Sequence, residues 1–172
     1  MLQIVRFALY SGELVMSSLS FTQNNPLLGT WKLISAIATL ADGTVEPDVY
    51  GPNPTGYITY TPEGQMMVIL SRSDRLPFSE EIRSPLSEDM YSVPIKERAQ
   101  AFATFSAYAG TYRLNGNTVT HHLEVASIPN RVGTDLVRTF TLDGNRVTLK
   151  TLPTMSNGVL KVFELIWERV EP

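Results

Sequence analysis

The 172-residue chain contains no cysteine. It therefore cannot form a disulfide, a thiolate metal site or a thiol nucleophile. Small secreted domains commonly depend on disulfides, whereas thiols of cytosolic proteins stay reduced. The absence of cysteine favours a cytoplasmic protein.

Charged residues are also few. They make up 18% of the chain, the formal net charge is -3 at pH 7, and lysine and arginine form no run. Without such a run, nothing would neutralise a phosphate backbone or hold an anionic membrane surface. Long apolar runs are missing as well, since none approaches the roughly 20 residues that span a bilayer. We expect neither nucleic acid as a partner nor a membrane span.

Several catalytic motifs are absent from the sequence. It has no Gly-x-Ser-x-Gly elbow, no phosphate-binding glycine loop and no dinucleotide fingerprint, which argues against hydrolase, kinase and dehydrogenase functions. The two histidines, His121 and His122, are adjacent. Neighbouring strand residues point to opposite faces, and no third ligand stands at a supporting spacing. We predict no metal and no cofactor.

What the chain does contain is enough apolar material, 43% of its residues, for one packed domain. We expect that domain over residues 26–172, preceded by a flexible leader over residues 1–25 whose end is rich in serine, threonine and asparagine. A signal peptide is the alternative for the leader, but Glu13 interrupts its apolar part and no small-residue cleavage site follows.

Short alternating segments separated by turn residues fill most of this domain. We predict strands over residues 30–40, 56–61, 65–71, 106–114, 117–126, 135–142, 146–152 and 159–170. The turn signals between them include Asp42-Gly43, Pro62-Glu63-Gly64, Asn115-Gly116, Asp143-Gly144 and Asn157-Gly158. Consecutive hairpins indicate an all-β, closed antiparallel up-and-down barrel of about eight or nine strands. An open sandwich of two sheets is the alternative.

One helical segment interrupts the strands. Ile95, Ala99 and Phe102 follow Pro94 at the spacing of a single buried face, and Ser92 is the predicted N-cap. The long segment over residues 71–94 leads into this helix. Because long loops of compact domains often cover binding sites, we interpret the segment and helix as a lid over the open end of the barrel. A plug that only stabilises the barrel is the alternative.

The motifs resemble those of the lipocalin-like domain family within the calycin barrels, over about residues 26–170. They are Gly29-Thr30-Trp31, Gly51-x-Asn53-Pro54-x-Gly56-Tyr57-x-x-Tyr60, Tyr108-Ala109-Gly110-Thr111-Tyr112, His121-His122-x-Glu124 and Trp167-Glu168-Arg169-Val170. The resemblance implies that Trp31 packs across the closed end of the barrel against Arg169, a structural role. It also implies an interior that takes hydrophobic molecules, in barrels that serve as passive carriers or as cofactor-free cyclases and isomerases.

Two residues form the main catalytic hypothesis. Alternation places His121 on one face of its strand, together with Val119, Leu123 and Val125. On the following strand, Arg138 shares a face with Leu136 and Phe140. We expect both faces to point inward. An imidazole exchanges protons near neutral pH, and a guanidinium can hold a carbonyl or an enolate oxygen. The alternatives are a core histidine and a surface arginine paired with an acid.

Tyr60 is the third catalytic candidate, because it shares a face with Ile58. Packing alone is the alternative for the tyrosines. Glu164 alternates with Phe163 and Leu165, which are better core residues, so we expect its carboxyl group outside the barrel; a buried acid is the alternative. The predicted substrate-binding residues are Tyr57, Tyr108, Leu123, Leu136, Phe140, Phe102 and Met66.

We therefore expect a cofactor-independent isomerase or cyclase that acts on a hydrophobic, oxygenated intermediate of polyketide or terpenoid type, as in secondary metabolism. The alternatives are a non-catalytic carrier of a hydrophobic small molecule and a filled barrel that serves as an interaction module. The sequence leaves a homodimer open.

Overall fold

The computed structural model describes residues 25–170. Apart from Asn25, the leader expected over residues 1–25 lies outside the described residues. The strands are β1 (Gly29–Leu40), β2 (Val45–Glu46), β3 (Thr55–Tyr60), β4 (Gln65–Ser71), β5 (Phe105–Asn115), β6 (Thr118–Ala126), β7 (Asp135–Asp143), β8 (Arg146–Thr151), β9 (Thr154–Ser156) and β10 (Val159–Arg169). None of the helices among these residues is long and apolar enough to cross a membrane.

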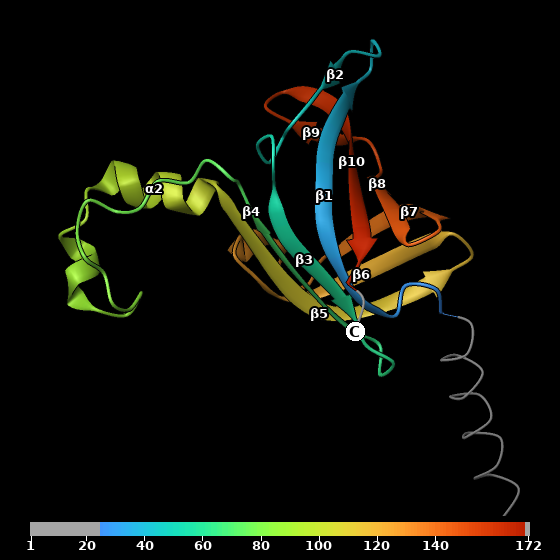
Figure 1. Cartoon of the computed structure of the whole chain (residues 1–172), viewed down its shortest axis with the longest axis horizontal. Coiled ribbons are helices and arrows are strands. Elements are labelled where there is room, and N and C mark those ends of the chain that lie inside the picture. Colours follow the sequence, from blue (N-terminus) through green and yellow to red (C-terminus); the bar gives the residue numbers. More distant parts are fainter. Residues whose placement is uncertain (1–24, 171–172) are drawn as a thin grey trace, which may run out of the picture.

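The strands form one antiparallel sheet that closes on itself (Figure 1). Their order is β2-β1-β3-β4-β5-β6-β7-β8-β10-β9, and β1 also pairs with β10. Eight strands therefore make the barrel wall, while the short β2 and β9 extend beyond it. Closure leaves no open edge in the wall. The predicted all-β, up-and-down barrel is confirmed, and the sandwich alternative is excluded.

One end of the barrel is closed by Trp31 and Arg169. The Arg169 guanidinium lies over the Trp31 indole, 4.0 Å from the ring centroid, and donates hydrogen bonds to the carbonyl oxygens of Leu28 and Pro26. This is the contact that the family resemblance implied. Gly29 has a φ of 103°, and a Cβ there would lie 3.2 Å from Arg169 Nη1. Glycine fits this position because it tolerates the left-handed conformation and leaves room for the guanidinium.

The helix forms where it was predicted, as α2 (Ile95–Ala103), after a short 3₁₀ turn η1 (Glu88–Tyr91). Its predicted buried face is wrong: no residue of α2 is buried, and Ile95 and Phe102 are 76% and 55% exposed. The N-cap is Pro94 without a side-chain cap; the Ser92 hydroxyl instead donates to the Asp89 carbonyl.

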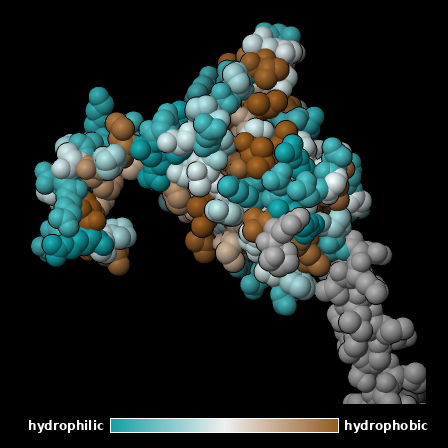
Figure 2. Space-filling view, in the orientation of Figure 1, coloured by the Kyte–Doolittle hydropathy of each residue, from teal (hydrophilic) through white to brown (hydrophobic). Residues whose placement is uncertain are grey.

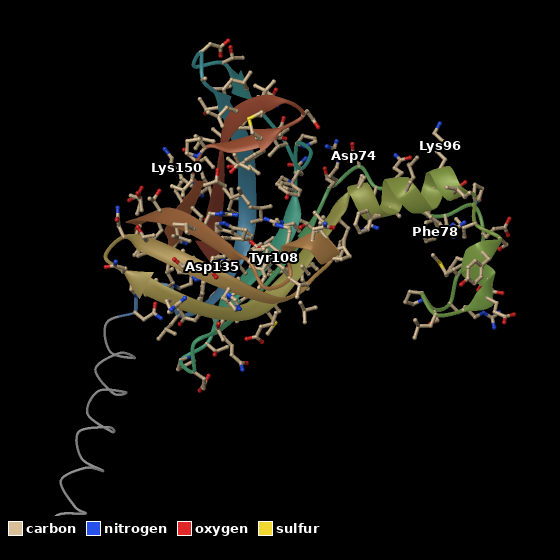
Figure 3. The ribbon with its side chains drawn as sticks, turned by 180° about the vertical axis from the view of Figure 1, so that it is seen from behind. Asp74, Phe78, Lys96, Tyr108, Asp135 and Lys150 are labelled. Atoms are coloured by element: carbon tan, nitrogen blue, oxygen red, sulfur yellow. The ribbon has the colours of Figure 1, made fainter. Side chains whose placement is uncertain are left out.

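The connection between β4 and β5 that contains α2 forms an arm that projects away from the barrel (Figures 1 and 2). Figure 3 shows Phe78 and Lys96 far out on this arm and Tyr108 on the barrel. The arm folds back on itself, because the Ser79 amide and hydroxyl donate to the Glu97 carboxylate at 2.9 and 3.1 Å. The helix thus packs on its own connecting segment and not across the barrel opening.

A β-bulge in β6 corrects one predicted face. Gly110 pairs with Leu123 but Ala109 pairs with Val125, so Glu124 is an extra residue in β6. The bulge reverses the alternation beyond it, and Val125 is 66% exposed instead of facing inward. His121 precedes the bulge and keeps its predicted inward face, with only 1% exposure.

Candidate functional site

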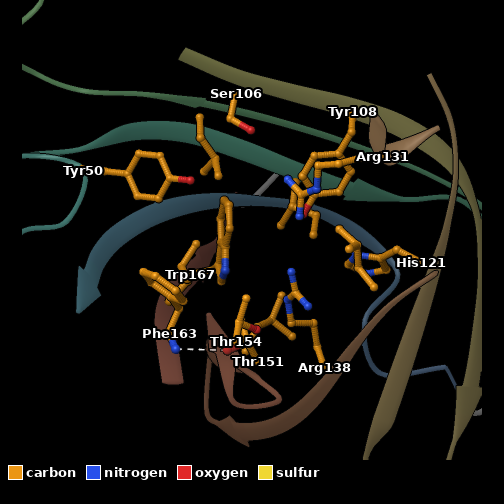
Figure 4. A pocket seen from close by; sticks show the side chains of 15 residues that line it. Tyr50, Ser106, Tyr108, His121, Arg131, Arg138, Thr151, Thr154, Phe163 and Trp167 are labelled. Carbon is orange, nitrogen blue, oxygen red and sulfur yellow. Dashed lines mark hydrogen bonds between the residues drawn. The ribbon is translucent and has the colours of Figure 1, made fainter. Parts of the chain in front are cut away.

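The interior of the barrel holds a cavity of about 230 Å³ (Figure 4). Most of its wall is apolar, and its polar groups come from tyrosine, serine, threonine, histidine, arginine and tryptophan. The lining residues are Tyr50, Ile58, Leu70, Ser106, Tyr108, His121, Arg131, Leu136, Arg138, Leu149, Thr151, Thr154, Phe163, Leu165 and Trp167. None of them carries a carboxyl group.

His121 and Tyr60 form a buried pair beside this cavity. The Tyr60 hydroxyl and Nε2 of His121 lie 2.8 Å apart in a hydrogen bond, and both side chains are 1% exposed. The pair holds two exchangeable protons and uses one between its members. Nδ1 of His121 is buried and has no partner among residues 25–170. When the Tyr60 hydroxyl donates to Nε2, the imidazole proton is on Nδ1 and has no partner among residues 25–170.

Burial also sets the protonation state of this pair. Desolvation, assisted by the positive charge of Arg138, lowers the pKa of His121 to about 3. Burial raises the pKa of Tyr60 well above its usual value. Both groups are therefore neutral at pH 7, and the pair is a neutral hydrogen-bond donor and not an ion pair.

Arg138 reaches the same cavity from β7. His121 pairs with Leu136 and Arg138 pairs with Val119, so His121 and Arg138 are diagonal neighbours on the inner face of β6 and β7. The sequence had left this register open. Nη1 of Arg138 donates to the Val137 carbonyl at 2.9 Å. The guanidinium lines the cavity, where it also lies close enough to the Tyr108 phenol to affect its pKa.

Arg131 is a second cavity arginine, which the sequence analysis missed. It ends a 3₁₀ turn, η2 (Pro129–Arg131), and its guanidinium stacks over the Tyr108 ring at 5.5 Å from the centroid. The turn lies in the connection between β6 and β7, where strand alternation assigns no face. Its position in a loop directly before the Arg138 strand is the signal that could have identified it.

Tyr50 and Tyr108 place phenol groups on the cavity wall. Burial raises the pKa of Tyr108, and the charges of Arg138 and Arg131 partly oppose this rise. Burial likewise raises the pKa of Tyr50. Both phenols are thus neutral hydrogen-bond donors. Nε1 of Trp167, which also lines the cavity, has no partner among residues 25–170. Tyr50 and Trp167 were not among the predicted binding residues.

The other predicted binding residues separate into three groups. Tyr108 and Leu136 line the cavity. Met66, Leu123 and Phe140 are buried in the barrel but do not line the cavity. Tyr57 and Phe102 lie away from it, which corrects their predicted placement.

The positions of Tyr57 and Phe102 away from the cavity follow from their places in the fold. Tyr57 alternates with the buried Ile58 and is therefore on the outer face, 45% exposed. Phe102 lies on the projecting arm. Glu164 is on the outer side of β10 as expected, where its carboxylate pairs with Lys150 at 2.6 Å.

Within residues 25–170, no three His, Asp or Glu side chains gather so as to hold a metal ion. His122 lies on the outer face of β6, and its Nδ1 hydrogen-bonds the Asp135 carboxylate at 2.8 Å. The two adjacent histidines thus serve opposite faces of the wall.

Comparison with known proteins gives one family match and two structural matches at low identity. A family model described as a lipocalin-like domain matches residues 28–170. A mutant of the fluorescent protein UnaG is 14% identical, with 83% of this chain and 95% of that chain covered and a TM-score of 0.32. The M. tuberculosis protein Rv2717c is 14% identical, with 90% and 98% covered and a TM-score of 0.31. No curated protein sequence matches the chain.

Proposed function

Because the chain belongs to the lipocalin-like domain family, we propose that its barrel binds a hydrophobic, oxygenated small molecule and isomerises or cyclises it without a cofactor. One observation carries the proposal. A guanidinium and a neutral imidazole–phenol pair meet at a cavity whose wall is otherwise mostly apolar. Such a cavity would hold a polyketide-like or terpenoid-like intermediate by its apolar surface and orient its oxygens by a few polar groups.

The chemistry proposed for Arg138, Tyr60 and His121 is proton transfer at a carbon next to a carbonyl group. Arg138 would donate hydrogen bonds to the carbonyl oxygen and stabilise the enolate that forms when an adjacent carbon loses a proton. The Tyr60–His121 pair would accept that proton and return one to a different carbon. No atom is gained or lost, so the product has the mass of the substrate.

His121 is a weak base in the free protein, because its pKa is about 3. Negative charge that develops on a substrate oxygen would offset the charge of Arg138, which is the second cause of that low pKa. The imidazole would then become more basic while the enolate forms. The fixed cavity wall would add to the rate by holding one reactive conformer of a flexible substrate.

The low pKa of His121 also favours a second candidate, a carrier that binds the same class of molecule and releases it unchanged. In a carrier, the imidazole and the phenol only donate hydrogen bonds to the cargo. A neutral, desolvated pair suits that role without any proton transfer.

The two candidates are separated by incubating the pure protein with small-molecule extracts of cells that make it, followed by liquid chromatography and mass spectrometry. An enzyme converts a compound into another of equal mass, and Arg138→Met and His121→Gln remove that conversion. A carrier retains a compound and releases it intact. The matched control is Arg113→Met, which removes an arginine from the exposed face of β5. If no compound is converted or retained, the proposal is wrong.

A further inference from the structure

The cavity contains two positive charges and no negative charge. Arg131 and Arg138 both line it, and none of its lining residues is an aspartate or glutamate. Neither arginine belongs to any of the ion pairs formed among residues 25–170. Figure 4 shows the two guanidinium groups reaching into the cavity from opposite sides.

Two lysines of the barrel wall are paired with carboxylates. The Lys161 ammonium, on a side chain only 10% exposed, lies 2.6 Å from the Glu46 carboxylate. Lys150 pairs with Glu164 at 2.6 Å. The wall cations without an ion pair among residues 25–170 include Lys32 and Arg113, and both of these are exposed to solvent. The two cavity arginines are half-buried and still have no carboxylate, in a chain whose net charge is negative.

Arg131 and Arg138 are half-buried, and two unpaired guanidinium groups that share one cavity repel each other. An anion bound between them would offset this repulsion. Arg131 lies over the Tyr108 ring, and this cation–π contact leaves its N–H donors for an oxyanion. The Tyr108 phenol adds a neutral donor at the same place.

Given the proposed binding of a small molecule in the barrel, we propose that this molecule is an organic anion. Its carboxylate, or an equivalent oxyanion, lies between Arg131 and Arg138, and another N–H donor of Arg138 serves the carbonyl oxygen of the proposed reaction. Its apolar part packs toward Trp167 and Phe163, which line the side of the cavity away from the two arginines in Figure 4.

The cavity volume limits the size of the enclosed part. An apolar cavity of roughly 150 Å³ is enough to bind benzene. The present cavity, about 230 Å³, therefore suits a single ring with a short side chain that ends in the acid group. A matched pair of probes follows from this size: 3-phenylpropanoate, which is an anion at pH 7, and 3-phenylpropanamide, its neutral isostere.

The test is titration calorimetry of both probes with the full chain at pH 7. We expect the acid to bind about 30-fold or more tightly than the amide, because losing one member of a buried charged pair costs at least about a factor of 30. Arg131→Met and Arg138→Met should each weaken binding of the acid by a similar factor. Both variants should change the affinity for the amide by no more than a few-fold. Unchanged amide binding shows that the variant cavity is intact. Arg113→Met, on the outer face, should change neither affinity.

Equal binding of the acid and the amide would overturn the anion proposal and leave the proposed small-molecule function standing. If only one of the two arginine variants loses the preference for the acid over the amide, the oxyanion binds at that arginine alone. That result would overturn a site shared by both arginines. If neither probe binds the unmodified protein, the proposed anion site is overturned, and the proposed small-molecule function is then decided separately by the incubation with cell extracts.

Discussion

The Tyr60 hydroxyl and the His121 imidazole meet in a 2.8 Å hydrogen bond between β3 and β6, strands that β4 and β5 separate in the barrel wall. The contact therefore spans the interior and is not a cross-strand pair. It brings a phenol and an imidazole together where water is excluded, and Arg138 lies near enough to affect the pKa values of both.

The low pKa of His121 predicts a stability that depends on pH. Folded His121 has a pKa of about 3, below the ordinary value of 6.5, so between these values the unfolded chain binds a proton that the folded chain does not. The free energy of unfolding should therefore fall as the pH drops from about 6.5 toward 3, by at most about 1.4 kcal/mol per pH unit from this group. Urea unfolding of the protein and of His121→Gln, which does not titrate, isolates the contribution as the difference between them. Parallel pH curves would contradict the prediction.

Arg138 should influence the titration of His121 measurably. Its charge contributes to the lowered pKa of His121, but desolvation is the larger cause. Arg138→Met should therefore raise the pKa of His121 and still leave it below 6.5. Nitrogen-15 NMR of the imidazole ring gives this value directly, with Arg113→Met as the control. An unchanged His121 pKa in Arg138→Met would show that the two side chains are not coupled in the folded protein.

Arg169 should be important for stability and not for ligand binding. Arg169→Met removes the stacking on Trp31 and two charge-assisted hydrogen bonds to backbone carbonyls, which together should cost about 3 kcal/mol of unfolding free energy. Arg146→Met breaks an exposed pair with Glu168 and should cost about 1 kcal/mol or less. Equal midpoints of urea unfolding for the two variants would refute the special role of Arg169.

Much of the fold could be predicted because its signals are local. Turn dipeptides and alternating residues determine a meander, and the predicted strand ends lie within a residue or two of the observed ones. The inward faces of His121 and Arg138 followed from alternation alone. The helix was located by its spacing, but its burial depends on what it packs against, which periodicity does not encode.

The candidate site was harder to predict because it depends on tertiary packing, which local sequence patterns do not encode. Alternation ranks every inward residue alike, so it could not separate Met66 and Phe140 in the packed interior from Leu136 at the cavity. Arg131 and Tyr50 lie on connections, where alternation assigns no face. Val125 was misplaced because a single extra residue, Glu124, reverses every face beyond it.

Gly110 lies opposite the β6 bulge, and its lack of a side chain is essential to the barrel. A Cβ at Gly110 would lie 2.0 Å from the His122 carbonyl oxygen and 2.9 Å from the Glu124 amide nitrogen, both of them backbone atoms. Gly110→Ala must therefore push β5 and β6 apart, which should cost about 3 kcal/mol or more of unfolding free energy. The matched control is Gly116→Ala, where a Cβ meets nothing within 4 Å and only the left-handed φ of 58° is unfavourable. That variant should lose about 1 kcal/mol. Urea unfolding measures both losses, and a Gly110→Ala loss no larger than that of Gly116→Ala would show that the two strands do not approach this closely.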